Sequence, residues 1–247
     1  MLWLQILILI LFIYSIVIIL RIFFAIYIVR INLKKTIPFN RYIDNSNHYC
    51  AVIGDSLAMG LGLSNNSYSL SGLLGRDFSN INIETYAKKG LKLGDLKLYS
   101  HILKYILTRK KYKLIIFIVG ANDVIRFTPF SEIESDLNDV IKKFKEKADN
   151  VIILHGGDVG RSPLFLPPLN WIYTNRTYKL KNIYEKAQEE YNNVYYINLL
   201  DDDYSEDFIK NPKNYFSKDL LHVNEKGVEF AYRKILEIIK SNKILFN

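Results

Sequence analysis

Residues 49–57 read YCAVIGDSL. The first five of them are apolar or aromatic, which is typical of a β-strand buried on both faces of a sheet. Gly54, Asp55 and Ser56 follow at once, so a carboxylate and a hydroxyl stand where the strand ends. In an open parallel sheet, ligands bind beyond the carboxyl ends of the strands. This stretch therefore predicts a parallel α/β fold that carries its chemistry at one edge of the sheet.

The rest of the chain repeats this pattern. Short runs rich in β-branched and aromatic residues alternate with longer runs in which apolar residues recur every three or four positions. The predicted strands are residues 49–53, 81–86, 114–119, 151–154 and 194–199. The predicted helices are residues 92–109, 131–148, 177–191 and 225–241. Strands that alternate with helices predict a doubly wound α/β domain built on a five-stranded parallel sheet.

Two local signals add detail to this prediction. Ser131 and Glu134 have the spacing of a capping box, which predicts that a helix begins at Ser131 and runs to about Ala148. Residues 164–173 read LFLPPLNWIY, and their two prolines are incompatible with a regular helix throughout. We expect this apolar segment to form a loop over the end of the fourth strand.

The N-terminus has a different composition. Residues 1–20 read MLWLQILILILFIYSIVIIL, and a helix of this length rises about 30 Å, the thickness of a hydrocarbon core. The chain stays apolar between Arg21 and Arg30. A cleaved signal peptide fits less well, because no charged segment precedes the run, the run is too long, and no small-x-small site follows it. We predict a transmembrane anchor over residues 1–30, a linker over 31–47 and a globular domain over 48–247.

Charge gives an orientation for this anchor. The chain holds 33 Lys and Arg against 25 Asp and Glu, a net charge of +8. Five of the basic residues and none of the acidic ones lie within residues 1–43. Such an excess beside an apolar helix suits anionic lipid head groups, and no nucleic-acid motif accompanies it. Because these charges flank the C-terminal side of the helix, the positive-inside rule predicts a single-pass membrane protein with a cytoplasmic domain.

Composition also excludes several classes of site. Cys50 is the single cysteine, so an intrachain disulfide and any multi-cysteine zinc or iron–sulfur site are impossible. The four histidines lack metal-ligand spacing, and we expect neither a metal nor another cofactor. The sequence has no P-loop, and no G-x-S-x-G surrounds Ser56.

Polar residues follow the other predicted strands as well. A hydroxyl, a carboxamide and an Asp/His pair that meet at one edge of a sheet are the components of a serine hydrolase. His155 and Asp158 end the fourth strand and are candidates for substrate contact, although a histidine hydrogen-bonded within its own loop is the commoner case. The segments concerned are Lys88-Lys89-Gly90, Gly120-Ala121-Asn122-Asp123, His155-Gly156-Gly157-Asp158 and Asp219-Leu220-Leu221-His222.

The residue types predict specific roles. Ser56 is a poor nucleophile unless a base takes its proton, and His222 is the natural base because its ordinary pKa lies near neutrality. Asp219 can accept a hydrogen bond from one ring nitrogen and hold the tautomer that faces Ser56. The oxyanion needs donors that are already in place. Candidate donors are the N–H groups of Ser56 and Gly90 (with Gly94 as the competing glycine) and the amide of Asn122.

These segments resemble the blocks of the SGNH (GDSL) hydrolase family. The four blocks occur in order, and the resemblance covers about residues 48–240. In two places the chain departs from the family pattern, at Ala87-Lys88-Lys89 before Gly90 and at Val223, where many members have proline. The matching residues are Ile53-Gly54-Asp55-Ser56-Leu57, Gly90, Gly120-Ala121-Asn122-Asp123, and Asp219-Leu220-Leu221-His222 followed by Asn224 and Gly227.

The resemblance implies a flavodoxin-like three-layer α/β/α fold and ester hydrolysis through an acyl-enzyme. It also implies Ser56, Gly90 and Asn122 as the oxyanion hole and Ser56, Asp219 and His222 as the catalytic triad. Asp55 and Asp123 are expected to organise their loops rather than to react.

Three functions remain open at this point. The first is a membrane-anchored serine esterase that cleaves an acyl ester of a lipid or lysophospholipid, favoured by the anchor and by the apolar segment 164–173. The second is an O-acetyl esterase or acetyl transferase that acts on an envelope glycan. The third is a membrane-tethered binding module without activity, which the complete set of catalytic residues disfavours. Fold and triad alone do not choose the acyl group.

Overall fold

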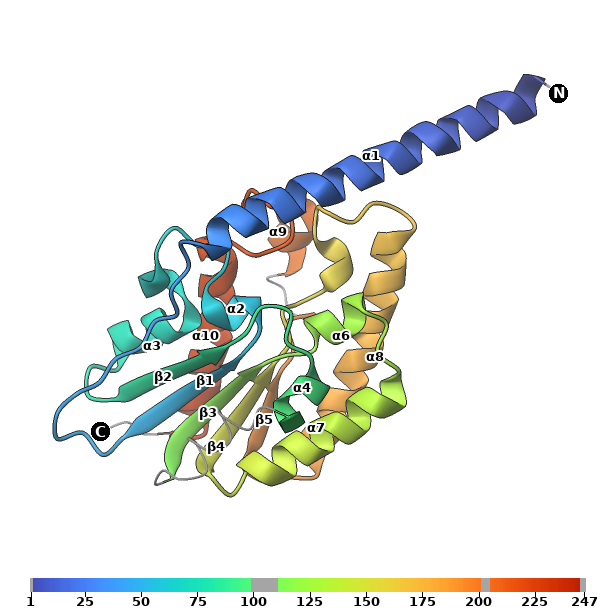
Figure 1. Ribbon diagram of the computed structural model, residues 1–247. Coiled ribbons are helices and arrows are strands. Elements are labelled where there is room, and N and C mark those ends of the chain that lie inside the picture. Colours follow the sequence, from blue (N-terminus) through green and yellow to red (C-terminus); the bar gives the residue numbers. More distant parts are fainter. Residues whose placement is uncertain (1, 99–110, 201–204, 245–247) are drawn as a thin grey trace.

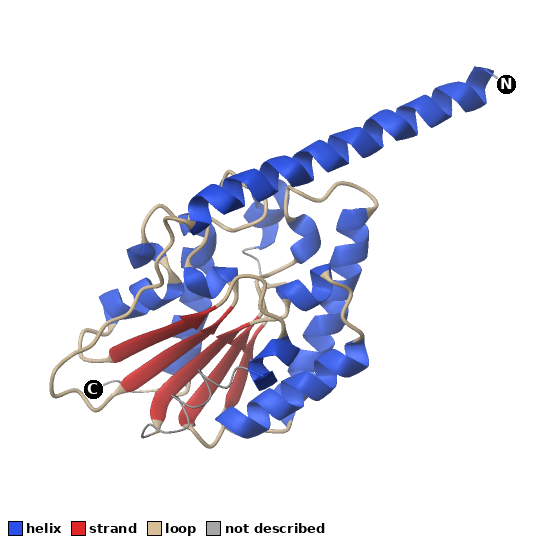
Figure 2. Cartoon of the chain, viewed as in Figure 1, coloured by secondary structure: helices blue, strands red, loops and turns tan. Residues whose placement is uncertain are grey.

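The computed structural model describes residues 2–98, 111–200 and 205–244. Within these ranges, five parallel strands form one sheet in the order β2-β1-β3-β4-β5, with helices on both faces (Figures 1 and 2). This is the three-layer α/β/α arrangement that the sequence predicts. The strands are β1 (Tyr49–Gly54), β2 (Asn82–Ala87), β3 (Tyr112–Ile118), β4 (Ala148–Leu154) and β5 (Val194–Ile197).

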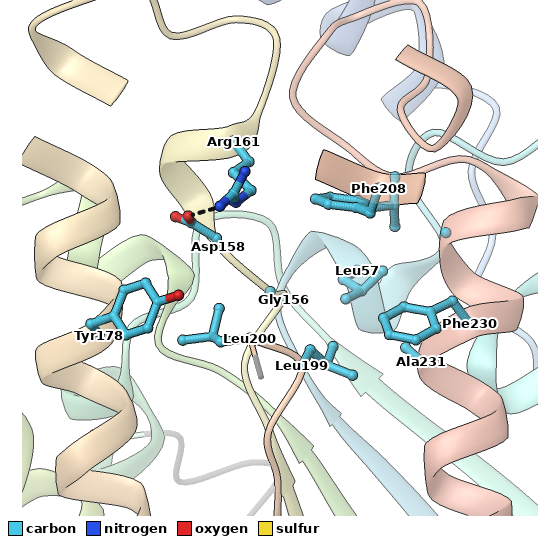
Figure 3. Close-up of a pocket in the computed structure, with 13 residues that line it drawn as sticks. Leu57, Gly156, Asp158, Arg161, Tyr178, Leu199, Leu200, Phe208, Phe230 and Ala231 are labelled. Atoms are coloured by element: carbon cyan, nitrogen blue, oxygen red, sulfur yellow. Dashed lines mark ion pairs between the residues drawn. The ribbon is translucent and has the colours of Figure 1, made fainter. Parts of the chain in front are cut away.

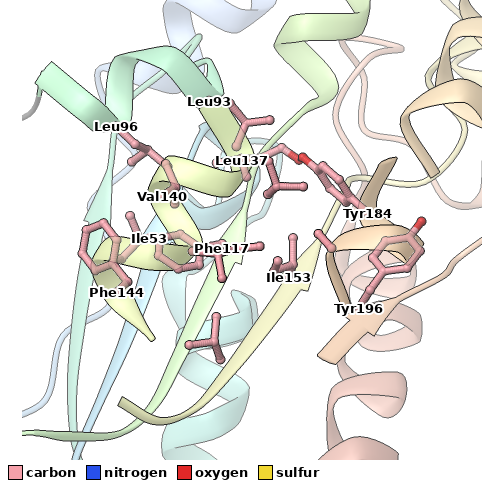
Figure 4. Close-up of a cluster of buried hydrophobic side chains, with 14 of the residues drawn as sticks. Ile53, Leu93, Leu96, Phe117, Leu137, Val140, Phe144, Ile153, Tyr184 and Tyr196 are labelled. Atoms are coloured by element: carbon pink, nitrogen blue, oxygen red, sulfur yellow. The ribbon is translucent and has the colours of Figure 1, made fainter. Parts of the chain in front are cut away.

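Alternation along β1 divides the core into two layers. Successive side chains of a strand point to opposite faces of the sheet. Cys50 and Val52 therefore pack on one face, against α3 (Leu70–Asp77) and α10 (Glu225–Ser241). Ala51 and Ile53 point to the other face, where Figure 4 shows Ile53 among the side chains of the covering helices. Those helices are α4 (Leu93–Leu98), α7 (Phe130–Phe144) and α8 (Leu169–Glu189).

Short helical elements follow the strands at their carboxyl ends. α2 begins two residues after β1, α6 begins soon after β3, and the 3₁₀ turn η2 follows β4. Backbone N–H groups at the start of such elements point out of the sheet edge, where they are available to a ligand. The short elements are α2 (Ser56–Met59), η1 (Asn66–Tyr68), α6 (Ala121–Ile125), η2 (Val159–Arg161), α9 (Ser205–Lys210) and η3 (Pro212–Asn214).

The N-terminal helix α1 (Leu2–Leu33) is 32 residues long. An 18-residue window of it has a mean hydropathy of 3.0 with no residue buried, so α1 is long and apolar enough to cross a membrane. Its C-terminal half lies across the carboxyl ends of the strands, and its N-terminal half projects away from the domain (Figure 1). Only Ala25 and Val29 of α1 are buried against the domain.

The segment after α1 covers an edge of the sheet. Arg41 forms an antiparallel bridge with Ile83 of the edge strand β2. Its guanidinium group donates to the carbonyl oxygens of Gly75, Phe78 and Ile81. An uncovered edge strand is a template for association with other chains, and this segment removes that hazard on one side.

Some predicted element boundaries are wrong. α7 begins at Phe130 behind Pro129, with no side-chain cap, so Ser131 lies inside the first turn and the capping-box prediction fails. The same helix ends at Phe144, and Ala148 already belongs to β4. Tertiary packing sets these limits, because Phe144 is the last buried position of the helix.

The apolar segment 164–173 is only partly a loop. α8 begins at Leu169, directly after Pro168, so neither proline lies within the helix and nothing in the remaining sequence opposes helix formation. The sequence placed the start of this helix at residue 177. It also gave no signal for α3, an eight-residue helix with two glycines. Residues 99–109 of the predicted helix 92–109 lie outside the described residues.

The aromatic contact between α7 and β3 should make a large contribution to stability. Phe144 is buried, and its ring packs edge-on to Phe117 with 5.1 Å between the ring centroids. Replacing Phe144 with Ala removes this contact and leaves a cavity, so the free energy of unfolding should fall by about 3–5 kcal/mol. Urea unfolding of the detergent-solubilised chain, followed by circular dichroism, measures the change.

The neighbouring exposed residue provides the control. Lys143→Ala should change the free energy of unfolding by less than about 0.5 kcal/mol. Equal effects of the two substitutions would mean that Phe144 does not contribute to the core as its position indicates.

Candidate active site

Ser56 is held at the exact junction between β1 and α2. Asp55 caps α2, because its carboxylate Oδ1 accepts a hydrogen bond from the N–H of Leu57 at 3.0 Å. α2 is a single turn capped at its C-terminus by Gly60, whose φ of 82° only glycine adopts without strain. Cap and terminus together fix the direction in which the Ser56 hydroxyl points.

The structure brings Ser56, His222 and Asp219 into one hydrogen-bonded chain. His222 Nε2 lies 2.9 Å from the Oγ of Ser56, although the two residues are 166 positions apart in the sequence. His222 Nδ1 lies 2.8 Å from Oδ2 of Asp219. A base within hydrogen-bonding reach of a hydroxyl, itself oriented by a carboxylate, is the geometry of an activated nucleophile.

Backbone hydrogen bonds within the loop that carries His222 hold this loop in place. The N–H of Ser217 donates to the carbonyl oxygen of His222 at 2.7 Å, and the N–H of Asn224 donates to that of Tyr215 at 2.9 Å. Asn224 then caps α10 by accepting from the N–H groups of Lys226 and Gly227. The helix and the hydrogen bonds within the loop thus position the backbone of His222.

Asp219 is fully buried, yet its carboxylate is well satisfied. Oδ1 accepts from the N–H groups of Leu221 and His222 at 2.9 and 2.8 Å, and Oδ2 faces the imidazole. Burial by itself raises the pKa of Asp219, but the hydrogen bonds and charge of His222 and the two N–H groups outweigh burial and hold the pKa below its usual value. The carboxylate is therefore ionised at neutral pH.

A second segment supports the turn between Asp219 and His222. Leu220 has a φ of 63°, a left-handed conformation that costs energy in a residue other than glycine. Its carbonyl oxygen accepts from the Ser162 hydroxyl at 2.6 Å and from the N–H of Leu164 at 3.0 Å. Ser162 also lines the cavity in front of Ser56. The sequence analysis missed Ser162, and no motif around it could have revealed it.

Asn122 lies opposite Ser56 and is oriented by Asp55. Its Nδ2 donates to Oδ2 of Asp55 at 2.9 Å, which fixes the side-chain amide with its NH₂ group toward the Asp55 side of the cavity. Burial raises the pKa of Asp55 to about 6, against the opposing effects of the N–H of Leu57, the charge of His222 and Asn122 itself. Asp55 thus organises both α2 and Asn122.

The glycine two residues before Asn122 is required by the backbone. Gly120 has a φ of 104°, and a Cβ added there would lie 2.5 Å from the Tyr184 hydroxyl. Asp123 turns away from the cavity and accepts a hydrogen bond from the N–H of Leu93 at 3.1 Å. It therefore ties α6 to α4, in keeping with the structural role expected of it.

Gly90 lies in the turn after β2, where the N–H of Leu91 donates to the carbonyl oxygen of Lys88. The N–H of Lys88 in turn donates to the carbonyl oxygen of Gly54, so this turn adjoins the end of β1. Gly90 has a φ of 72° and faces the Arg126 guanidinium, but it does not line the cavity in front of Ser56. Its role as an oxyanion donor stays a prediction. The competing Gly94 lies in α4 against the carboxylate of Asp136.

His155 lies behind the cavity rather than in it. Its ring nitrogens face the Tyr196 hydroxyl and the carbonyl oxygen of Gly157, and burial lowers its pKa to about 4. These contacts match the alternative of a histidine hydrogen-bonded within the fold. Asp158 does line the cavity, but its carboxylate is engaged by the Thr174 hydroxyl and by the Arg161 guanidinium at 3.3 Å.

Two adjoining cavities open at this edge of the sheet. The first surrounds Ser56 and His222, has a volume of about 100 Å³ and is partly open to solvent. The second has a volume of about 40 Å³ and is mainly apolar, as Figure 3 shows with Leu199, Leu200, Phe208 and Phe230 around it. The two share Leu57, Gly156, Asp158 and Val223 as a common wall.

The cavity in front of Ser56 holds groups suited to nucleophilic chemistry. Among the residues that the structure describes, no three His, Cys, Asp or Glu side chains are grouped so that they could hold a metal ion. A hydroxyl, an imidazole and a buried carboxylate in series, with an amide NH₂ nearby, can instead transfer a proton and accept an acyl group.

Solved structures share this fold. A member of the lipolytic protein G-D-S-L family from Veillonella parvula aligns with a TM-score of 0.60 and 18% identity, over 78% of this chain and 98% of that one. The acetylxylan esterase Axe2 from Geobacillus stearothermophilus aligns with a TM-score of 0.54 and 18% identity, over 82% and 96%. The psychrotrophic esterase EstA from Pseudoalteromonas sp. gives 0.54 and 18%, over 79% and 98%.

Sequence comparison gives the family. No curated protein matches the chain significantly. The pattern of the GDSL-like lipase/acylhydrolase family matches residues 52–230, which is most of the chain and includes every residue of the hydrogen-bonded chain from Ser56 to Asp219. The protein therefore belongs to the GDSL-like lipase/acylhydrolase family of ester-hydrolysing enzymes.

Proposed function

We propose that the protein is a membrane-anchored serine esterase that cleaves acyl esters of lipids, such as lysophospholipids, through an acyl-enzyme on Ser56. The observation that carries this proposal is the continuous hydrogen-bonded chain from Ser56 through His222 to Asp219, with distances of 2.9 and 2.8 Å. Membership of the family indicates ester hydrolysis, and this hydrogen-bonded chain indicates which residues carry it out.

The proposed reaction begins at the Ser56 hydroxyl. Its Oγ attacks the ester carbonyl carbon while His222 Nε2 accepts the proton. The imidazolium that forms is stabilised by Asp219, which is ionised and faces Nδ1. His222 then gives the proton to the leaving alcohol, and the acyl group stays on Ser56. Water, deprotonated by His222, attacks this acyl-enzyme and releases the carboxylic acid and free Ser56.

The oxyanion of each tetrahedral intermediate needs donors. We assign the N–H of Ser56 and the second amide proton of Asn122, whose first proton is committed to Asp55. The N–H of Gly90 is the proposed third donor. Preorganised donors of this kind stabilise the transition state because they need not rotate as charge develops.

The surroundings of Ser56 support an apolar acyl group. The second cavity adjoins the Ser56 cavity and offers leucine and phenylalanine side chains to a hydrocarbon chain. The apolar helix α1 lies across the same edge of the sheet (Figure 1). An ester with a long acyl chain would bury apolar surface in this cavity, which an acetyl group cannot do.

The alternative is an O-acetyl esterase or acetyl transferase that acts on an envelope glycan. It shares the same residues and differs in the acyl group. The basic residues that follow α1 support a cytoplasmic domain, which would keep the site away from such a glycan. A C-terminal reporter fusion that is active only outside the cytoplasm would contradict this orientation and favour the glycan.

The nucleophile can be tested directly. Ser56→Ala should abolish both the hydrolysis of p-nitrophenyl butyrate and labelling by a fluorophosphonate probe, because it removes the hydroxyl that lies 2.9 Å from His222 Nε2. Ser131→Ala is the matched control: this serine is exposed on α7, so labelling and turnover should match the unaltered enzyme. Labelling that persists in Ser56→Ala would refute the assignment.

The orientation of Asn122 by Asp55 gives a second prediction. Asp55→Asn keeps an oxygen for the N–H of Leu57 but places an NH₂ group against that of Asn122, which must then turn. Losing one oxyanion donor should lower kcat about 100- to 1,000-fold with little change in KM.

A double-mutant cycle provides the control for that effect. If Asp55 acts through Asn122, then Asp55→Asn should cost little more in kcat once Asn122→Ala is present. Additive losses from the two substitutions would show that Asp55 acts by another route.

The acyl group can be tested at the wall between the cavities. Gly156 lies there, and a Cβ added to it would meet only Leu57, at 3.8 Å. Gly156→Val should narrow the passage, so turnover of p-nitrophenyl octanoate should fall relative to the acetate, while Gly156→Ala should leave the ratio nearly unchanged. An unaltered enzyme that prefers acetate over octanoate, with no response of this ratio to Gly156→Val, would favour the acetyl alternative.

A further inference from the structure

Two hydrogen bonds join α1 to the segment that follows η2. The Tyr14 hydroxyl donates to the carbonyl oxygen of Pro167 at 2.6 Å, and the Arg21 guanidinium donates to that of Pro163. We call residues 163–172 the rim segment, since it borders the cavities at the carboxyl edge of the sheet. The rim segment is thus attached to α1 at two heights along the helix.

Helix geometry makes this attachment significant. The twelve helical residues of α1 before Tyr14 rise only about 18 Å, which is short of a hydrocarbon core of about 30 Å. A helix that crosses the core therefore needs further residues, up to about Leu20. Tyr14 then lies about 10 Å inside the boundary marked by Arg21. When α1 spans a membrane, Pro167, which accepts the hydrogen bond from Tyr14, therefore cannot lie in bulk water.

The composition of the rim segment suits that position. It reads PLFLPPLNWI, and Asn170 is its one polar side chain. Trp171 is 66% exposed and Ile172 is 40% exposed, although both are large and apolar. Tryptophan is enriched at the boundary between lipid and water. Exposed apolar side chains next to a membrane helix are the surface that a bilayer covers.

Much of the backbone of the rim segment also has hydrogen-bond partners within the protein. Polar backbone groups need partners within the protein where water is absent. The three prolines bring no N–H group. The N–H groups of Phe165, Asn170 and Ile172 donate to the carbonyl oxygens of Ser162, Leu166 and Pro168. The carbonyl oxygens of Pro163 and Pro167 are the two that α1 satisfies.

We infer that the rim segment inserts into the boundary region of the bilayer that α1 crosses, so that the cavities at the sheet edge open toward lipid. The partner is a lipid surface. This inference rests on the proposed function in one respect, that α1 spans a membrane. It makes the substrate an ester that enters from the bilayer itself, without transfer through water.

A depression between α1 and the rim segment offers the entry path. It adjoins the Ser56 cavity at Ser162 and the apolar cavity at Arg161 and Phe208. Arg21 and Lys213 bring positive charge to it, which suits a phosphate head group, and the aromatic residues suit the acyl chain. The lining includes Arg21, Phe165, Leu166, Trp171, Phe208 and Lys213.

The two tryptophans of the chain permit a direct test of depth. Trp3 lies near the start of α1 and Trp171 lies in the rim segment. Trp3→Phe leaves Trp171 as the sole tryptophan, and Trp171→Phe leaves Trp3. Each full-length variant is reconstituted into vesicles of phosphatidylcholine and phosphatidylglycerol with bromine at chosen depths along the acyl chains. Quenching by the bromolipids and by aqueous iodide is then measured.

We expect the emission of Trp171 to be blue-shifted, to be quenched most by bromine near the head groups, and to be little affected by iodide. If Trp3 is quenched by bromolipids while Trp171 is quenched only by iodide, α1 is in the bilayer and the rim segment is not, which overturns the inference and leaves the anchor intact. If bromolipids quench neither, both the inference and the anchor fail. Fluorophosphonate labelling of Ser56 in the same samples reports separately on the proposed chemistry.

Discussion

The buried carboxylate of Asp219 is the constraint around which the site is organised. A carboxylate that is fully buried needs hydrogen-bond donors. For Asp219 these donors are two N–H groups of its own turn and the imidazole of His222. That arrangement forces Leu220 into a left-handed conformation and leaves its carbonyl oxygen for Ser162 and Leu164. The position of His222 relative to Ser56 therefore depends on a segment outside the loop that carries His222.

A similar dependence holds on the opposite side of the cavity. One oxygen of the Asp55 carboxylate accepts a hydrogen bond from the first turn of α2, and the other accepts one from the Asn122 side chain. One buried side chain therefore sets the position of the proposed nucleophile and of a proposed oxyanion donor. Its raised pKa shows that this position has an electrostatic cost, which burial imposes and the neighbouring donors only partly offset. A side chain in such a position is expected where geometry matters more than stability.

The N-terminal helix α1 and the proposed catalytic loop are physically connected. Arg21 binds the carbonyl oxygen of Pro163, and the adjacent Ser162 binds that of Leu220 in the turn between Asp219 and His222. The position of α1 and the position of the turn are thus linked by two hydrogen bonds through Ser162 and the rim segment. The same segment that we place in the lipid boundary supports the residues that would act on a lipid ester.

The sequence alone predicted the five parallel strands and most of the helices, because burial on both faces and helical periodicity are local signals. It also predicted that Asn122, Asp219 and His222 lie near Ser56, because polar residues that follow parallel strands share one edge of the sheet. Two other predicted site residues, Gly90 and His155, do not line that cavity. It misplaced the ends of α7 and the start of α8, where the packing of Phe144 and a proline at the helix boundary decide the limits.

Only the tertiary structure decided the support of Leu220 by Ser162, the orientation of Asn122 by Asp55 and the place of α1 across the site. Each of these contacts joins residues more than fifty positions apart, and neither the spacing nor the type of the residues predicts it. Local sequence determines elements and the chemistry at their ends. The partners that hold those ends in position are set by packing between elements, which no local pattern records.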